Sequence, residues 1–265
     1  MLPPERLLAV VFTTALGAAR ALPVVWMVAP LGGPRLPAAV RVGFALLLAL
    51  VASPVLVVAA GADRLADVSA LRFVLMIARE VVVGLCLALV ASAVFRAAEI
   101  AGRLGDSLRG ANVAEILVPT AEERASPLGV LYVLLATLVF LQIGGVPRVV
   151  EALLGSYEAL PIAGGLGEVS ARRAAFVVAI VAAKLVGAGV ALAAPVIVAL
   201  WLTDLALGLI ARAAPSVPVY FVGLPLKGLL AIGIVLLGLG ALESAIASNL
   251  ASWLRMLRQT TDAFR

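Results

Sequence analysis

The sequence predicts an all-α, polytopic membrane protein with about six long hydrophobic helices arranged in hairpins. Of its 265 residues, 64% are hydrophobic and 13% are charged, and the mean hydropathy is +1.18. A soluble domain does not need so many apolar residues, whereas a chain that crosses a membrane several times does. Apolar runs of about membrane length, separated by polar stretches, supply the helices. Because no segment is polar enough to form a soluble domain, residues 1–265 are expected to form a single membrane domain.

Residue types that are rare or missing exclude most enzymatic chemistry. The chain has no histidine, which removes zinc-protease motifs and the nucleophile pairs that depend on histidine. Its one cysteine, Cys86, cannot form an internal disulfide, and a cysteine within an apolar run more often packs than reacts. We therefore expect no enzyme, no cofactor and no metal. The net charge of +5 comes from arginines that are not interleaved with aromatic residues, so it fits anionic lipid headgroups and not nucleic acid.

Three apolar runs, residues 7–29, 38–60 and 73–95, are expected to form the first three spans. No basic segment precedes the first run, so we expect a retained span and not a cleaved signal peptide. Arg20 lies near the middle of the first run, and Glu80 lies in the first third of the third run. Charged side chains at these depths are expected to face protein or water and not lipid.

Residues 96–126 form the longest polar break in the chain. They combine many charged residues with one apolar patch, Ile116, Leu117, Val118 and Pro119. A polar connection of this length in a compact membrane protein is usually either functional or disordered. The residues alone favour an ordinary solvated loop.

The next three segments are a fourth span at residues 127–143, an amphipathic stretch at 144–173 and a long apolar run at 174–211. The amphipathic stretch is expected to contain a short helix lying on the membrane surface. The long run would measure about 57 Å as one helix, well beyond a bilayer core of about 30 Å. We therefore expect this run either to kink at Pro195 or to project from the membrane.

The C-terminal part begins with a predicted helical hairpin at residues 192–247. Pro215 and Pro218 end its first arm, because proline lacks an N–H and biases the preceding residue away from helix. The second arm is expected to restart through Gly223 and Pro225, since proline is tolerated in the first turn of a helix. This arm continues as the last span, and an amphipathic tail at residues 249–265 follows it.

Each arm of the hairpin carries one charge deep in apolar sequence. Asp204 precedes Pro215 by about 16 Å of helix, and Lys227 follows Pro218 by about 14 Å, at about 1.5 Å per residue. A direct ion pair across the hairpin is therefore geometrically possible. The alternative is that each charge pairs with another helix or extends to an interface. The tail carries Trp253 and is expected to lie in the membrane interface.

The hairpin resembles the C-terminal part of the export-apparatus T component of type III secretion systems, the SctT family, whose flagellar counterpart is FliR. The residues that carry the resemblance are Pro195, the run TDLALG at 203–208, Arg212, Pro215 and the run VGLPLK at 222–227. The resemblance covers most of the chain and is strongest after residue 192.

This resemblance implies a structural subunit of an export gate in the bacterial inner membrane. Family members form a multi-pass, helical hetero-oligomeric gate that projects toward the periplasm. Its other subunits are SctR and SctS, with the switch component SctU at the cytoplasmic entrance, and unfolded secreted proteins pass through. The motif GGVP at residues 144–147 resembles the corresponding sequence of virulence-type members. This resemblance favours an injectisome over a flagellum.

The resemblance also implies roles for two segments. Residues 103–124 correspond to the loop that helps plug the closed pore, entered through Arg109 and Gly110, with the apolar patch at 116–119 inside it. The hairpin turn, with Arg212 beside it, is expected to face the cytoplasm and meet SctU. Membrane lipid and the neighbouring subunits would cover the apolar spans between them.

Charged residues within the apolar runs leave a second class of function open. They fit contacts between subunits of a gate, and they also fit the path of a small-molecule or proton-coupled permease. The chain lacks the internal repeat that marks many transporters, which counts against a permease, and the missing histidine counts against an intramembrane enzyme. The candidate contact residues are Arg20, Glu80, Lys184, Asp204, Lys227 and Glu243.

Overall fold

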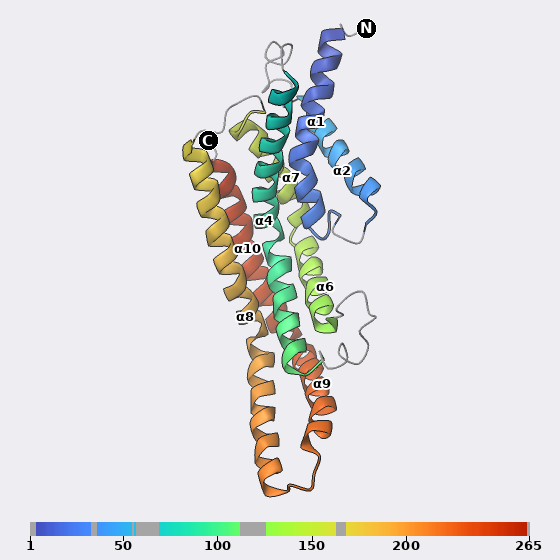
Figure 1. Ribbon diagram of the computed structural model, residues 1–265, viewed down its shortest axis with the longest axis vertical. Coiled ribbons are helices and arrows are strands. Elements are labelled where there is room, and N and C mark those ends of the chain that lie inside the picture. The colour runs from blue at the N-terminus through green and yellow to red at the C-terminus, as the bar shows by residue number, and fades with distance from the viewer. Residues whose placement is uncertain are drawn as a thin grey trace. The chain divides into compact units, whose positions relative to one another are not determined.

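The computed structural model describes residues 4–32, 36–54, 56, 69–111, 126–162 and 168–263. Within these ranges the chain forms eight helices and no strand, which confirms the predicted all-α class. The helices, labelled in Figure 1, are α1 (Pro4–Met27), α2 (Ala38–Val51), α4 (Ala70–Leu108), α6 (Pro127–Gln142), α7 (Gly145–Ala159), α8 (Glu168–Ala213), α9 (Val219–Leu237) and α10 (Leu239–Ala263).

Four of the described helices, α1, α4, α8 and α9, are long and apolar enough to cross a membrane. The count rises to five if α6 and α7, which meet at an angle of 74°, are taken as one broken span. The predicted count of about six is therefore approximate. The second predicted span accounts for part of the difference, because α2 has only 14 residues and residues 57–60 lie outside the described part of the chain.

Helix α4 extends well into the predicted polar break. Residues 96–108 are helical, so the expected loop at 103–124 begins later than the sequence indicated. Ion pairs along the helix surface favour this extension, because Glu99 accepts hydrogen bonds from Arg96 at 3.2 Å and from Arg103 at 2.7 Å. The charged residues in this segment were taken as a sign of a loop. Their spacing of three and four residues is instead typical of a solvated helix.

Two prolines, Pro195 and Pro225, lie inside helices, and Pro225 was expected in the first turn of its helix. Helix α8 is assigned as one helix of 46 residues, about 69 Å long, with Pro195 in its interior. Helix α9 starts directly after Pro218, so Gly223 and Pro225 lie within it and do not begin it. Apolar helices tolerate an interior proline where neighbouring groups satisfy the freed backbone carbonyl.

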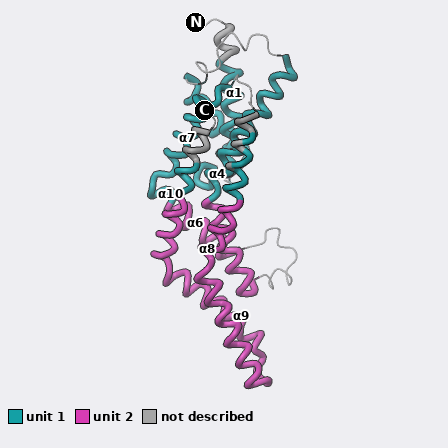
Figure 2. Tube along the Cα trace, turned by 90° about the vertical axis from the view of Figure 1, so that its left-hand side faces the viewer, with its two compact units in different colours: residues 1–93, 140–182, 251–265 teal, residues 94–139, 183–250 magenta. Residues whose placement is uncertain are grey.

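The chain divides into two compact units, coloured separately in Figure 2. Unit 1 comprises Met1–Ala93, Phe140–Ala182 and Ala251–Arg265, and unit 2 comprises Val94–Val139 and Ala183–Leu250. Each unit combines segments that are distant in sequence.

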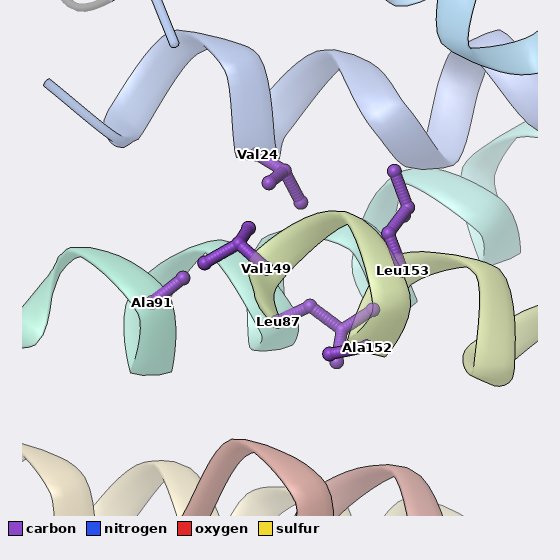
Figure 3. Close-up of a pocket in the computed structure, with 6 residues that line it drawn as sticks. All are labelled: Val24, Leu87, Ala91, Val149, Ala152 and Leu153. Atoms are coloured by element: carbon purple, nitrogen blue, oxygen red, sulfur yellow. The ribbon is translucent and has the colours of Figure 1, made fainter. Parts of the chain in front are cut away.

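The core of unit 1 is the meeting of α1, α4 and α7. At Gly84 of α4 an added Cβ would lie 2.2 Å from the backbone oxygen of Arg20, so the two backbones touch and only glycine fits. Figure 3 shows the apolar side chains where the three helices meet, and they leave no room for a water molecule. These side chains are Val24 of α1, Leu87 and Ala91 of α4, and Val149, Ala152 and Leu153 of α7.

This packing corrects two predictions of helices lying on the membrane surface. The apolar face of α7 is buried against α1 and α4, so it is not available to a bilayer. Trp253 and Leu254, on the apolar face of the tail in α10, are likewise buried within the protein. Helical amphipathicity indicates only that one face is covered, and here the protein itself covers it.

Unit 2 is held by close backbone approaches between its helices. A Cβ added at Gly102 of α4 would lie 2.3 Å from the backbone nitrogen of Gly129 in α6. At Gly223 of α9 it would lie 2.8 Å from the side chain of Leu207 in α8. The second contact joins the two arms of a hairpin formed by α8 and α9. We call residues 195–237 the α8–α9 hairpin; it is shorter than the predicted hairpin at 192–247.

Candidate functional site

A buried cluster of charged residues joins three helices of unit 1. Arg20 of α1 and Glu80 of α4 have no solvent exposure, and Arg20 Nε donates to Glu80 Oε2 at 2.6 Å. Arg79 donates from Nη1 to the other carboxylate oxygen of Glu80 at 3.2 Å. One carboxylate therefore serves two guanidinium groups. We refer to Arg20, Arg79 and Glu80 as the arginine–glutamate cluster.

Helix α7 and the chain just after it complete the surroundings of Arg20. Its Nη1 donates to the backbone oxygen of Ser156 at 2.7 Å, and its Nη2 donates to the backbone oxygen of Leu160 at 2.9 Å. The guanidinium also lies 4.7 Å from the ring centre of Tyr157, whose hydroxyl donates to the backbone oxygen of Gly17 at 2.8 Å. Arg20 thus has partners on every side, as a buried cation requires.

The cluster's chemistry is structural. Arg20 and Glu80 are bonded to one another, to Arg79 and to backbone carbonyls, and neither has any solvent exposure, so a solute cannot reach them in this conformation. Removing one member of such a network is far more costly than removing an exposed ion pair, because it leaves a charge buried and unpaired. The cluster therefore joins α1, α4 and α7 into one body.

The hairpin carries the second charged contact. Lys227 Nζ forms an ion pair with Asp204 Oδ1, so of the two arrangements left open by the sequence the structure has the direct pair. The pair is only partly covered, since the Asp204 side chain is 49% exposed and that of Lys227 is 17% exposed. The pair lies near the Leu207–Gly223 contact. Its two residues lie at about the same distance from the hairpin turn, and the pair holds the two arms together.

The remaining two candidate contact residues are not buried by this chain. Lys184 of α8 and Glu243 of α10 are exposed, and within the described part of the chain neither makes an ion pair. Cover by neighbouring subunits stays a prediction for these two residues.

The outer surface of the hairpin is apolar and uncovered. Large side chains are exposed on both arms, with values as high as 92% for Leu237. The turn is also exposed, including Arg212, Pro215 and Pro218, whereas Gly223 is buried between the arms. Such an area exceeds what a chain surrounded by water exposes, and it marks a surface for lipid or protein. The larger exposed residues include Trp201, Leu205, Leu209, Phe221, Leu229 and Leu237.

Sequence reasoning missed a third polar centre, at Asp106 near the end of α4. Its Oδ2 accepts hydrogen bonds from Ser126 Oγ at 2.6 Å and from the backbone nitrogen of Leu128 at 3.0 Å. Its Oδ1 accepts from Arg109 Nε at 2.7 Å. Ser126 in turn accepts a hydrogen bond from the Gly129 nitrogen at 3.1 Å, which caps the first turn of α6.

Asp106 therefore fastens together the two ends of the predicted plug segment. Ser126 followed by Pro127 is a recognisable signal for the start of a helix. Nothing in the sequence indicated that an aspartate twenty residues earlier would contact this helix start. Gly110 leaves α4 with a φ of +82°, and Leu224 of α9 lies where its side chain would be. The positive φ favours glycine at this position. The apolar patch, Ile116, Leu117, Val118 and Pro119, lies outside the described residues.

Comparison with known proteins decides the family. Residues 11–252 match the family described as bacterial export proteins, family 1. The chain belongs to this family. The resemblance to the SctT and FliR proteins drawn from the hairpin motifs is therefore confirmed.

Relatives from both branches of the family match the chain. It is 34% identical over 165 residues to Yop proteins translocation protein T of Yersinia pestis. That match covers 62% of this chain and 63% of the relative, so the chain spans less than two thirds of that protein. Flagellar biosynthetic protein FliR of Bacillus subtilis is 28% identical over 200 residues, 75% of each chain. FliR of Caulobacter vibrioides is 26% identical over 256 residues, 96% of each chain.

Proposed function

We propose that this protein is a structural subunit of a type III protein-export gate in the bacterial inner membrane. It lines and closes the pore through which unfolded proteins leave the cell. The observation that carries this proposal is the family match, which extends over residues 11–252. The four long apolar helices agree with a membrane location.

The placement of charge supports a gate subunit over a permease. A permease path needs charged groups that a solute can reach, yet Arg20 and Glu80 are closed off and bonded within unit 1. Asp204 and Lys227 neutralise one another. The exposed apolar hairpin needs cover, which the neighbouring subunits of a gate provide.

The proposed partners are the R and S components, SctR and SctS, and the switch component SctU. The direct experiment is affinity purification of the tagged chain from membranes of cells that produce all four proteins. We expect SctR and SctS to co-purify in a fixed ratio with this chain. Purification of the chain without either component would contradict the proposed function.

We place the gate in an injectisome, and a flagellar gate is the second candidate. The identity to the Yersinia translocation protein is 34%, and the GGVP motif resembles that of virulence-type members. The flagellar alternative is favoured by the Caulobacter FliR match over 96% of each chain. Deleting the gene and measuring effector secretion and swimming separates the two. Loss of secretion with normal swimming is the expected result.

The plug proposal concerns the segment after α4. Its two ends are fixed by Asp106, and a segment anchored at its base can leave and return without unfolding its neighbours. Shortening the chain across residues 110–118 is expected to leave the gate assembled and leaky, with raised ion conductance across the inner membrane. A shortened protein that assembles and conducts no more than the wild type would eliminate this role.

The orientation proposal concerns the exposed hairpin turn. Arg212 lies beside this turn, and basic residues near span ends are enriched on the cytoplasmic side. A Ser216→Cys variant, made with Cys86→Ala so that one thiol remains, should react with a membrane-impermeant thiol reagent only from the cytoplasmic side. Labelling from the periplasmic side alone would reverse the topology.

A further inference from the structure

One face of α4 within unit 2 is polar, although the helices beside it expose apolar residues. The side chains of Arg96 and Arg103 are 52% and 61% exposed on this face. Glu99 lies between them and is partly exposed, and Ser107 follows one turn later and is exposed. The spacing of three, four and four residues places all four on one stripe of the helix. We refer to Arg96, Glu99, Arg103 and Ser107 as the polar stripe.

The polar stripe lies between α6 and α8 (Figure 1). On one side, Cγ of Arg103 lies 3.5 Å from the position that a Cβ on Gly129 of α6 would take. On the other side, Ile100 of α4 packs against Gly189 of α8. At about 100° per residue, Gly102, which touches α6, and Ile100 fall on opposite sides of the stripe.

The surfaces of α6 and α8 beside the stripe are apolar. Between residues 127 and 139 and between 183 and 198, every exposed residue except Lys184 is apolar or glycine. The same stretch of unit 2 therefore presents a hydrophilic face flanked by hydrophobic ones. The large exposed side chains are Val130, Leu134 and Leu138 of α6, and Val186, Val190 and Val198 of α8.

The two kinds of face require different surroundings. Charged side chains in membrane proteins rarely face acyl chains, and they pair with one another or line water-filled cavities. Glu99 pairs with both arginines, at 3.2 and 2.7 Å, yet more than half of each arginine side chain remains exposed. The pairing therefore does not replace water around the stripe. The leucines and valines on either side need lipid or protein.

We propose that the polar stripe lines the water-filled path through the gate, and that unfolded substrates pass along it. The apolar faces of α6 and α8 then turn toward lipid or neighbouring subunits. The inference rests on the proposed function, because it needs a gate, and it names the part of this chain that faces the substrate.

The internal pairing of the stripe suits a surface along which a chain must move. An unfolded polypeptide presents backbone amides and side chains of every kind, so its path has to be wet without binding any segment tightly. Glu99 already engages both arginines. A passing charged group gains little by displacing such partners, because exposed ion pairs contribute little to begin with.

Lipid headgroups fit this position less well than a water-filled path. Gly105 of α4 lies beside Val196 of α8, and Ile100 lies beside Gly189, so the two helices run in the same direction here. Farther along α8, past the end of the stripe, Trp201 is 61% exposed. Headgroups lie at the ends of a span, whereas the apolar surface of α8 continues beyond the stripe.

The first experiment measures water access in the intact complex. Ser107→Cys on the stripe and Leu134→Cys on α6 are each made with Cys86→Ala, and the complex with SctR and SctS is treated with a charged thiol reagent. We expect the cysteine at position 107 to react at least about tenfold faster, because a charged reagent does not enter an apolar contact. Protection of both cysteines would overturn the inference, while co-purification with SctR would still uphold the proposed function.

The second experiment tests contact with the substrate. A photo-crosslinking amino acid is placed at Arg96, Ser107 or Leu134 in cells where a secreted protein of the same system, fused to a tightly folded domain, is stalled in the gate. We expect crosslinks to the stalled protein from positions 96 and 107 and none from position 134. Crosslinks from the stripe to SctR, SctS or lipid in place of the stalled protein would overturn the inference.

Charge reversal separates a wet face from a contact between subunits. Arg103→Glu should leave co-purification with SctR unchanged, because an exposed ion pair contributes little to stability. Leu134→Glu is the matched change on the apolar face, and it should reduce co-purification at least about tenfold, because lipid or an apolar subunit surface cannot accommodate the charge. Equal effects of the two substitutions would contradict the assignment of the faces.

Discussion

The two charged contacts of this protein are covered to very different extents. In unit 1, Arg20 and Glu80 are fully buried and are held by α1, α4, α7 and the chain after α7. In unit 2, Asp204 and Lys227 pair across the hairpin while half of the Asp204 side chain remains exposed. Around the first contact the protein is packed, and around the second it presents uncovered apolar side chains. The first contact therefore stabilises the isolated chain. The second lies on a surface that lipid or neighbouring subunits still have to cover.

The largest effect is expected for Glu80→Gln. The substitution leaves two guanidinium groups buried without a counter-charge, which costs about 3–5 kcal/mol. We expect a large fall in the melting temperature of the purified protein and in its level in membranes. Glu99→Gln, which removes a partly exposed acid between two exposed arginines of the same helix, is the control and should cost less than about 1 kcal/mol. Equal effects of the two changes would mean that the cluster does not hold unit 1 together.

Gly84→Ala comes next. The new methyl group would lie 2.2 Å from a backbone oxygen of α1, which cannot move aside as a side chain could. Overpacking typically costs about 1–3 kcal/mol, and this position should be near the upper end. At Gly187 of α8 a methyl group would meet nothing within 4 Å, so Gly187→Ala should be neutral or slightly stabilising in the same thermal measurement. A neutral Gly84→Ala would show that α1 and α4 are not in direct contact.

Asp106→Asn should have an intermediate effect. The amide cannot accept at both positions as the carboxylate does, and it loses the charge-assisted bond from Arg109, together about 1.5 kcal/mol. We expect the complex to assemble but to conduct ions more readily than the wild type, because the ends of the proposed plug segment are no longer fixed. Ser126→Ala, which removes one of the three donors, should act in the same direction and more weakly. If the Asp106→Asn complex conducts ions no more readily than the wild type, Asp106 has no role in closing the pore.

The smallest effect on the isolated chain is expected at the hairpin. Asp204→Asn or Lys227→Met should each change its stability by less than about 1 kcal/mol, because the pair is partly exposed. Within the assembled gate the same single changes should impair assembly and secretion more strongly, and the double neutralisation should be milder than either. Unchanged assembly and secretion in both single variants would remove the structural role of this pair.

The sequence predicted the class of fold well, because apolar runs of membrane length give a direct signal. It also located four of the residues in the two charged contacts, Arg20, Glu80, Asp204 and Lys227, since a charge in an apolar run is conspicuous. It could not show which face of an amphipathic helix the protein covers, so α7 and the tail of α10 were placed on the membrane. It also missed Asp106, because a charged residue in a polar segment looks like any other until its partners are known.

Helix boundaries were the weaker part of the prediction. Pro225 was expected in the first turn of its helix, yet α9 begins earlier, at Val219. Charge was taken to end α4 near Arg96, yet ion pairs spaced by three and four residues extend it to Leu108. The three- and four-residue spacing of these charged residues can be read from the sequence, and it was a better signal for helix than their charge was for a loop.

The most direct test of the contrast between the two contacts is thiol accessibility with and without partners. Single cysteines replace Leu205 or Leu237 on the hairpin and Leu87 in the unit 1 core, each in a Cys86→Ala background. Labelling rates are compared in detergent for the isolated chain and for the complex with SctR and SctS. We expect the hairpin cysteines to react quickly in the isolated chain and slowly in the complex, and the cysteine at position 87 to react slowly in both. Hairpin cysteines that react equally fast in the two states would contradict the account.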